Sequence, residues 1–465
     1  MYRITVLPGQ LHIETPGGGD LLAVLRSAGL RPDAPCGGQG RCGKCRVNVD
    51  GKEVLACRTA VDRDMTVTLP DHRDQRILTA GGEVPGEGEL RPGYQLAFDI
   101  GTTTVVGYLL RDGEEIACAG MANPQAVFGA DVISRIRAAV RGQMGPMTES
   151  IRACLKDLTA GLCKNGEEVN LISVVGNSAM QQILLGIPVD NLAKVPFAPV
   201  LTRGEVRGNL LIVPDIAGFV GADTVACILA TGMDQTEELT LLVDIGTNGE
   251  MALGNRHKMA ACSAAAGPAL EGAGIKFGMR GQPGAIDHVY FEHGKLGCTV
   301  IGGGEAVGIC GSGLIDAVAA ALDAGWLNPR GKILTEDGLI HLANKIYLTQ
   351  EDIRQVQLAK GAIAAGIYLM AENLGVTLEE IERVYLAGAF GTYMDPKSAC
   401  RMGLLPRPLA GKITAVGNAA GTGAKILACC PGALERAQRI VDTTEALELA
   451  ALPGFARCFA KNMRF

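Results

Sequence analysis

The chain has 465 residues, a formal charge of −6, and a composition of 48% hydrophobic and 20% charged residues. At about 150 residues per domain, these values indicate a folded protein of several domains and exclude a disordered chain. A net acidic chain with few aromatic residues also lacks the clustered Lys and Arg that nucleic-acid phosphates require, so nucleic-acid binding is excluded.

Glycine accounts for 63 residues, about twice its usual frequency, which indicates many tight turns and close backbone approaches. The 15 cysteines are too dispersed for a small disulfide scaffold. The first residues lack the apolar core of a signal peptide, and no apolar run reaches the ~20 residues of a membrane span. We therefore expect a cytoplasmic protein with reduced thiols and no membrane contact.

Residues 1–72 are expected to form a small α+β domain. Alternating residues and amphipathic spacing predict a hairpin, a short helix and two further strands. In chain order these are Tyr2–Leu7 with Gln10–Thr15, Asp20–Ala28, Lys44–Val49 and Met65–Leu69.

Between the helix and the last strand lie four cysteines, Cys36, Cys42, Cys45 and Cys57, in a glycine-rich segment. Four thiolates suit an iron–sulfur cluster, because glycines let backbone N–H groups turn towards the sulfurs. A zinc knuckle usually pairs two Cys-x2-Cys units or adds histidines, and only one such unit is present, but zinc and plain thiols stay as alternatives. With strands on both sides, the segment resembles the plant- and adrenodoxin-type 2Fe–2S ferredoxins, although its loop is one residue longer and Cys57 follows closely. The resemblance implies a β-grasp fold and a 2Fe–2S cluster.

Residues 73–93 are polar and rich in Gly and Pro, which predicts a flexible linker. From Tyr94 onward apolar strands alternate with helices, a pattern that favours an α/β architecture. Asp99-Ile-Gly-Thr102 recurs 145 residues later as Asp244-Ile-Gly-Thr247, each time at the end of an apolar run. The repeat predicts two similar lobes that face one another, 94–240 and 241–465.

The two repeated turns carry the residue types that bind Mg²⁺ and phosphate. An acidic residue at a strand end can hold Mg²⁺ through water, and glycine amides and hydroxyls can meet phosphate oxygens. The candidates are Asp99, Gly101, Thr102, Thr103 and Thr104 in the first turn, and Asp244, Gly246, Thr247, Asn248 and Glu250 in the second. A third turn after an apolar strand, with Gly388, Ala389, Phe390 and Gly391, could pack on a nucleotide's flat face. Glycines around Gly303, and Gly311–Gly313 before a helix expected near Leu314, suit anion binding.

Each turn alone is a common structural feature, but the three in this order resemble the phosphate 1, phosphate 2 and adenosine motifs of the acetate and sugar kinase, Hsc70 and actin superfamily. There is no Walker A motif. The resemblance implies an actin-like ATPase made of two duplicated ribonuclease-H-like lobes, with ATP and Mg²⁺ bound between them.

A 2Fe–2S ferredoxin domain joined to such an ATPase resembles the ATP-dependent reductive activators of corrinoid proteins. Further segments that resemble this family are Val175-Gly-Asn177, Cys262–Gly272, Gly278-Met-Arg280, Cys310–Asp316, Gln357–Lys360 and Val416–Gly421. The resemblance implies reduction of an inactive Co(II) corrinoid protein to Co(I), with the electron delivered through the cluster. It implies as partners a corrinoid protein and a low-potential donor such as a ferredoxin, flavodoxin or reductase, with a homodimer as a further expectation.

Within that family Asp99 and Asp244 are expected to position Mg²⁺ and the attacking water, with Glu250 as a weaker candidate for the water. Ser263 either faces the corrinoid or lies in a buried turn. Two departures stand out. The larger relatives carry a separate middle domain, where this chain has only a short linker. Many relatives also have a His shortly after Val-Gly-Asn, where this chain has Gln181 and Gln182.

Three other functions fit parts of the sequence. A kinase would phosphorylate a small acid or sugar, with the ferredoxin as a redox switch. A different ATP-gated electron donor would feed another low-potential enzyme, as the activators of 2-hydroxyacyl-CoA dehydratases do. A non-enzymatic ferredoxin on an inactive ATP-sensing module is disfavoured, because Asp99 and Asp244 are both present.

Overall fold

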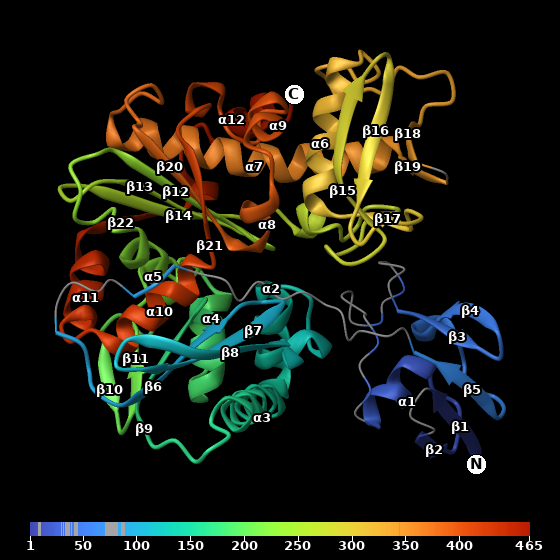
Figure 1. Cartoon of the computed structure of the whole chain (residues 1–465), viewed down its shortest axis with the longest axis horizontal. Coiled ribbons are helices and arrows are strands. Elements are labelled where there is room, and N and C mark those ends of the chain that lie inside the picture. The colour runs from blue at the N-terminus through green and yellow to red at the C-terminus, as the bar shows by residue number, and fades with distance from the viewer. Residues whose placement is uncertain are drawn as a thin grey trace.

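The computed structural model describes residues 1–7, 11–28, 30, 32, 38, 40, 45–69, 82–84, 89–343 and 345–465, with Ala389 and Phe390 described by their backbone alone. Figure 1 shows a small N-terminal domain standing apart from a larger two-lobed body. The first and second cysteines of the sequence motif, Cys36 and Cys42, lie outside the described residues.

The N-terminal domain is a five-stranded sheet in the order β2-β1-β5-β3-β4, covered by one helix. Its elements are β1 (Tyr2–Leu7), β2 (Leu11–Thr15), α1 (Leu21–Ser27), β3 (Arg46–Val49), β4 (Lys52–Leu55) and β5 (Met65–Thr68). Helix α1 begins where Asp20 caps the N–H of Ala23 at 2.8 Å. The predicted hairpin and helix are present, and β1 pairs parallel with β5, as in a β-grasp. Sequence reasoning missed β4, which is half polar and only four residues long.

The first lobe is built on a six-stranded sheet in the order β10-β11-β9-β6-β7-β8. Its strands are β6 (Tyr94–Ile100), β7 (Thr104–Arg111), β8 (Glu114–Ala122), β9 (Val169–Gly176), β10 (Glu205–Arg207) and β11 (Leu210–Ile212). Strands β6, β7 and β8 form an antiparallel meander, and β9 runs parallel to β6. One face packs against α2 (Val132–Ala138), α3 (Met144–Leu162) and α4 (Ser178–Leu185).

The second lobe repeats the arrangement of five of these strands, β11-β9-β6-β7-β8, in a sheet of order β21-β20-β12-β13-β14-β22, where β22 is an added edge strand. Its strands are β12 (Thr240–Ile245), β13 (Gly249–Gly254), β14 (Met259–Ala264), β20 (Arg383–Ala387), β21 (Ile413–Gly417) and β22 (Thr444–Leu447). Here β12, β13 and β14 form the meander and β20 runs parallel to β12. The motif residues Asp99 and Asp244 therefore sit at equivalent places, near the ends of β6 and β12.

Further elements cover the second lobe. The helices are α6 (Gly311–Asp323), α7 (Gln350–Leu374), α8 (Gly388–Tyr393), α9 (Pro396–Arg401) and α12 (Phe455–Asn462), whereas α11 (Ala433–Thr443) packs against α5 (Ala222–Thr231) in the core between the lobes. A smaller layer contains β15 (Ala285–Glu292), β16 (Lys295–Val300), β17 (Gly308–Ile309), β18 (Ile340–Ala343) and β19 (Ile346–Leu348). Helix α6 begins at Gly311, three residues earlier than the sequence predicted, so the glycines form its first turn.

Two helices, α5 (Ala222–Thr231) and α10 (Ala419–Cys429), lie between the two sheets and join the lobes through one apolar core. This core includes Tyr108 of the first sheet and Leu242 of the second. Although α10 follows the second lobe in sequence, it packs against α5, β6 and β9 of the first lobe. The Oγ of Ser173 on β9 donates to the carbonyl oxygen of Ala424 on α10 at 2.6 Å. The C-terminal half of the chain thus supplies a wall of the first lobe.

Over its described residues, the linker predicted at 73–93 contacts α10 and the core between the lobes, while its flexibility stays a prediction. The N–H of Gly82 donates to Thr422 Oγ1 at 2.8 Å, and Lys425 Nζ donates to the Gly82 carbonyl oxygen at 2.7 Å. Val84 and Leu90 pack against the core between the lobes. These contacts form because α10 presents the Thr422 hydroxyl and the Lys425 ammonium beside apolar surface. The composition of the linker gives no sign of them.

Helix α10 can lie close to α5 because Gly423 has no side chain. A Cβ at this position would lie 2.1 Å from the carbonyl oxygen of Ala226. We expect Gly423→Ala to lower the free energy of unfolding by about 1–3 kcal/mol, since the two helices must separate. The matched control is Gly161→Ala in α3, where no atom lies within 4 Å of the added Cβ and the change should add about 0.5–1 kcal/mol. Urea denaturation of both variants tests this, and equal effects would contradict the packing argument.

Candidate functional site

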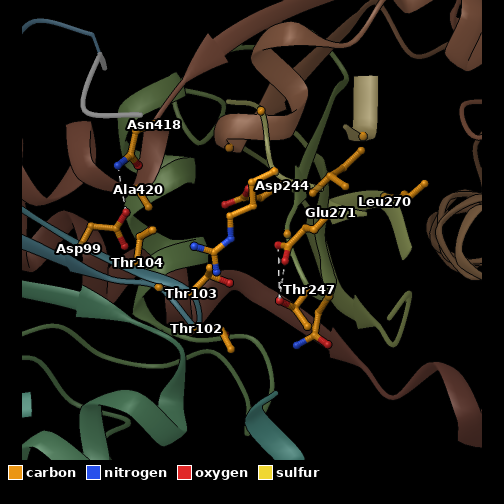
Figure 2. Close-up of a pocket in the computed structure, with 18 of the residues that line it drawn as sticks. Asp99, Thr102, Thr103, Thr104, Asp244, Thr247, Leu270, Glu271, Asn418 and Ala420 are labelled. Atoms are coloured by element: carbon orange, nitrogen blue, oxygen red, sulfur yellow. Dashed lines mark hydrogen bonds between the residues drawn. The ribbon is translucent and has the colours of Figure 1, made fainter. Parts of the chain in front are cut away.

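A cavity of about 350 Å³ opens between the two lobes, where the repeated turns meet. Figure 2 shows Asp99 and Thr102–Thr104 on one side of this cavity and Asp244, Thr247 and Glu271 on the other. All ten candidates of the two turns line it: Asp99, Gly101, Thr102, Thr103, Thr104, Asp244, Gly246, Thr247, Asn248 and Glu250. The sequence repeat therefore marks two halves of one site.

Three consecutive carbonyl groups of the first turn accept hydrogen bonds from residues of the first lobe. The carbonyl oxygen of Gly101 accepts from Asn123 Nδ2 at 2.7 Å, and that of Thr103 accepts from the Asn123 N–H at 2.9 Å. The carbonyl oxygen of Thr102 accepts from Arg135 Nη2 at 2.5 Å. In a trans peptide the following N–H points away from the carbonyl, so the N–H groups of Thr102, Thr103 and Thr104 point away from these partners. Such successive N–H groups make an anion-binding concavity.

The second turn is closed by a hydrogen bond from the Gly246 N–H to the Asn248 carbonyl oxygen at 2.9 Å. Thr247 Oγ1 lies 3.4 Å from both carboxylate oxygens of Glu271. Gly388, with a φ of +83°, begins α8 against this turn, and a Cβ there would lie 2.6 Å from Asp244 Oδ1. Only glycine allows that approach, which brings the third sequence motif to the cavity wall.

Carboxylates dominate the electrostatics of the cavity. Burial raises the pKa of Asp99 to about 7, against a hydrogen bond from Asn418 Nδ2 at 3.0 Å that lowers it. Burial, with the nearby Asp223 charge, raises the pKa of Asp244 to about 6. Burial also raises the pKa of Asp223 to about 6 and that of Glu250 well above its usual value. Four acidic groups share one cavity, each with a pKa raised by burial, and a bound cation would stabilise their charged forms.

Arg280 is the one Lys or Arg among the described residues that line the cavity. Its charge lowers the pKa of Glu271, although burial raises that pKa more. No set of three or more His, Cys, Asp or Glu in the described part of the chain converges as a ready-made metal site. Mg²⁺ usually keeps several waters and binds through one or two carboxylates plus substrate phosphates.

Sequence reasoning missed several residues that line the cavity, and four of them bear on its charge or its hydrogen bonds. These are Asp223 at the start of α5, Glu271, Arg280 and Asn418 at the start of α10. Glu271, Arg280 and Asn418 stood inside segments that resembled the family, but nothing in their spacing marked them as ligands. Asp223 lies in the first turn of α5, two residues after Gly221, and an acidic residue in a first helical turn is too common to single it out.

The remaining candidates lie elsewhere or are only partly described. Gly303 lies in an exposed turn after β16, and Gly391 packs against Leu386 inside α8; neither lines the cavity. Ala389 and Phe390 belong to α8, but their side chains lie outside the description. Ser263 on β14 donates from Oγ to Glu250 Oε1 at 3.2 Å. It therefore lies beside the acidic site, and its contact with a corrinoid stays a prediction.

In the N-terminal domain, two of the four candidate ligands are described. The sulfurs of Cys45 and Cys57 lie 3.2 Å apart, with Cys45 buried and Cys57 half-buried. Gly38, at a φ of +94°, lies so close that a Cβ there would be 3.9 Å from Cys57 Cβ. Paired thiols beside a glycine turn fit an iron–sulfur cluster.

Gln181 and Gln182, which stand near the position of the relatives' histidine, are both buried in the first lobe. Gln181 Nε2 lies 3.3 Å from Asp215 Oδ1, and Gln182 Nε2 donates to the Pro188 carbonyl oxygen at 2.7 Å. In this chain, these two side chains stabilise the interior of the lobe rather than present a surface to a partner.

Comparison with known proteins identifies the family. The corrinoid activation enzyme RamQ of Eubacterium limosum is 31% identical to this chain over an alignment that covers 95% of each protein. The chain belongs to the RACo family. The RACo C-terminal ASKHA domain model matches residues 238–465, the RACo middle-region model matches 94–236, and a 2Fe–2S iron–sulfur cluster binding domain model matches 4–69.

Two further relatives agree with this assignment. The Co(II) methylated amine-specific corrinoid protein reductase of Methanosarcina barkeri is 35% identical over 58% of this chain and 54% of its own. The solved structure of a reductive activator for a corrinoid, iron–sulfur protein superposes with a TM-score of 0.71 at 27% identity, covering 100% of this chain and 98% of the other. The predicted fold class, the 2Fe–2S cluster and the use of Mg-ATP are thereby confirmed.

The expectation of a missing middle domain was wrong as stated, since the RACo middle-region model matches the first lobe. The alignment with RamQ spans 567 positions, more than the 465 residues here, so that relative carries residues that this chain lacks. Among the described residues, no helix is long and apolar enough to cross a membrane.

The raised pKa of Asp99 makes stability depend on pH. The native carboxyl keeps its proton to about pH 7, whereas the unfolded chain releases it near 3.8, so the free energy of unfolding falls between these values as pH rises. Asp99→Asn removes the titrating group, so its free energy of unfolding should not fall in this way. The difference in free energy of unfolding between Asp99→Asn and the wild type should rise by about 1–3 kcal/mol from pH 4 to pH 7. Denaturation at several pH values without nucleotide measures it. Asp157→Asn, on an exposed position of α3, controls for loss of a carboxylate, and an equal pH trend there would refute the assignment.

Proposed function

We propose that this protein uses Mg-ATP to drive the reduction of a Co(II) corrinoid protein to its Co(I) state. The observation that carries the proposal is the joining of a ferredoxin-type domain, with paired thiols at Cys45 and Cys57, to a cavity that carries both phosphate turns. Membership of the RACo family supports it, because the relatives RamQ and the Methanosarcina reductase bear names of corrinoid activation and Co(II) corrinoid reduction.

The need for ATP follows from reduction potentials. A ferredoxin-type cluster supplies one-electron transfer at about −400 mV, and we expect the Co(II)/Co(I) couple to lie lower. A gap of about 200 mV would make the transfer uphill by roughly 4.6 kcal/mol, more than three decades in equilibrium constant. A protein that closes on ATP can supply this free energy through a difference in its affinity for the two partner states.

In this proposal the carboxylates hold the metal and the water. Asp99 and Asp244, on equivalent strands, bind Mg²⁺ through its water shell. Asp223 and Glu250 face the same cavity with pKa values raised by burial, and that of Asp223 is about 6. A carboxylate with a pKa near 6 is a suitable acceptor for the proton of the attacking water. We assign this role to Asp223, with Glu250 as its neighbour.

The turns and Arg280 bind the phosphates. The N–H groups of Thr102–Thr104 and the hydroxyl of Thr247 donate to phosphate oxygens. Arg280 supplies positive charge in a cavity that otherwise carries carboxylates. Gly388 lets α8 approach the nucleotide side of Asp244. We further propose a low-potential donor such as a ferredoxin, flavodoxin or reductase, and a cytoplasmic location. The homodimer stays a prediction.

The decisive experiment is anaerobic mixing of the reduced, cluster-loaded protein with a Co(II) corrinoid protein, followed by Co(I) absorbance with and without Mg-ATP. Co(I) should form only with ATP, and Asp99→Ala should abolish it. Asp157→Ala, at an exposed position of α3, should leave it intact. Absence of Co(I) with several corrinoid proteins, together with ATP hydrolysis stimulated by a small acid or sugar, would favour the kinase instead.

Arg280 offers a second test of the same site. Arg280→Met removes the cavity's positive charge, so we expect the KM for ATP to rise at least about tenfold, the usual cost of a lost charged hydrogen bond. Arg280→Lys should recover part of this loss, because it keeps the charge without the planar fork. Steady-state ATPase assays measure both. A KM unchanged in Arg280→Met would remove Arg280 from the phosphate site.

A further inference from the structure

Behind the first phosphate turn lies a fully buried arginine. Arg135, on α2, has no exposed surface. Its Nε donates to the Gly129 carbonyl oxygen at 3.0 Å, its Nη2 to the Thr102 carbonyl oxygen at 2.5 Å, and its Nη1 approaches the sulfur of Met180 at 3.3 Å. All three partners are neutral, and no acidic group forms an ion pair with Arg135 within the described structure.

A buried charge with neutral partners is costly, since burial removes its hydration and no counter-ion repays it. Desolvation lowers the pKa of Arg135 to about 10, with the charge of Asp131 acting against this effect. The side chain is therefore still protonated at neutral pH. Asp131 itself is committed to capping α2, where its Oδ1 accepts from the Ser134 N–H at 2.7 Å.

The missing negative charge has a natural place on the other side of the turn. Arg135 holds the carbonyl of Thr102, and the N–H of Thr103 in the same peptide group points the opposite way. A phosphate bound at the Thr103 N–H would lie at one end of the Thr102–Thr103 peptide dipole, with the Arg135 guanidinium at the other end. In a low dielectric, charges so arranged interact strongly.

We propose that Arg135 is a positioning residue for ATP, which fixes the Thr102–Thr104 turn with its N–H groups towards the cavity and supplies the buried charge that phosphate neutralises. The inference rests on the proposed use of ATP but not on the corrinoid partner. Its role is distinct from that proposed for Arg280, which lines the cavity itself.

The test uses Arg135→Met in the full chain, with Arg137→Met, an exposed position on the same helix, as the matched control. Without nucleotide, the melting temperature of Arg135→Met should stay close to that of the wild type, because a costly buried charge is lost along with its hydrogen bonds. The rise in melting temperature on adding Mg-ATP should fall by at least half. The KM for ATP should increase about tenfold or more with a much smaller change in kcat, as for a contact made equally in ground and transition states.

A purely structural role gives the opposite pattern: a lower melting temperature without nucleotide, with the ATP-induced rise and the KM as in the wild type. That result would overturn the proposal. If Arg135→Met does not fold, Arg135→Lys decides, since it keeps the charge but loses the fork; its KM should rise several-fold, and an unchanged KM overturns the proposal. A wild-type protein that shows no ATP-induced rise would instead overturn the proposed function, so the two failures are distinguishable.

Discussion

The central physical feature of the structure is a set of acidic side chains buried around one cavity between two lobes. Asp99 and Asp244 come from equivalent strands of a duplicated fold, and Asp223 joins them from the helix that separates the sheets. Burial holds the pKa values of all three between about 6 and 7. Such a site is poorly compensated without a cation, so Mg²⁺ and a nucleotide phosphate complete it electrostatically. In the proposed function, the free energy from ATP would change how the lobes pack and so make the uphill electron transfer possible.

Helix α10 connects this site to the rest of the molecule. At its start Asn418 donates to Asp99 Oδ2 and lies 3.2 Å from the hydroxyl of Tyr108. One turn later Thr422 and Lys425 hold the linker at Gly82, and Lys425 also pairs with Glu115 at 2.8 Å. The linker between the ferredoxin domain and the ATPase therefore contacts the same helix, α10, that contacts the carboxylate of Asp99 in the cavity. A movement of Asp99 could therefore reach the linker through α10 alone.

The sequence was informative where function requires a local pattern. The repeated Asp-Ile-Gly-Thr turns and the glycine turn at Gly388 could be recognised because each is a local backbone pattern that lies within a few consecutive residues. Residues that reach the site by tertiary packing could not: Asp223 and Asn418 are brought there by α5 and α10, whose positions follow from the close contact at Gly423. The same limit explains the linker, whose composition indicates flexibility while its docking depends on side chains more than 300 residues away.

The central claim is that carboxylate charge in the cavity makes nucleotide binding depend on the metal. Isothermal titration of the cluster-loaded protein with ATP at pH 8, with and without Mg²⁺, measures this most directly. We expect Mg²⁺ to tighten ATP binding by at least about tenfold. Asp223→Asn should narrow this difference between the affinities with and without Mg²⁺, because it removes one carboxylate that repels the phosphates. Equal affinities with and without Mg²⁺, or the same difference in Asp223→Asn, would contradict it.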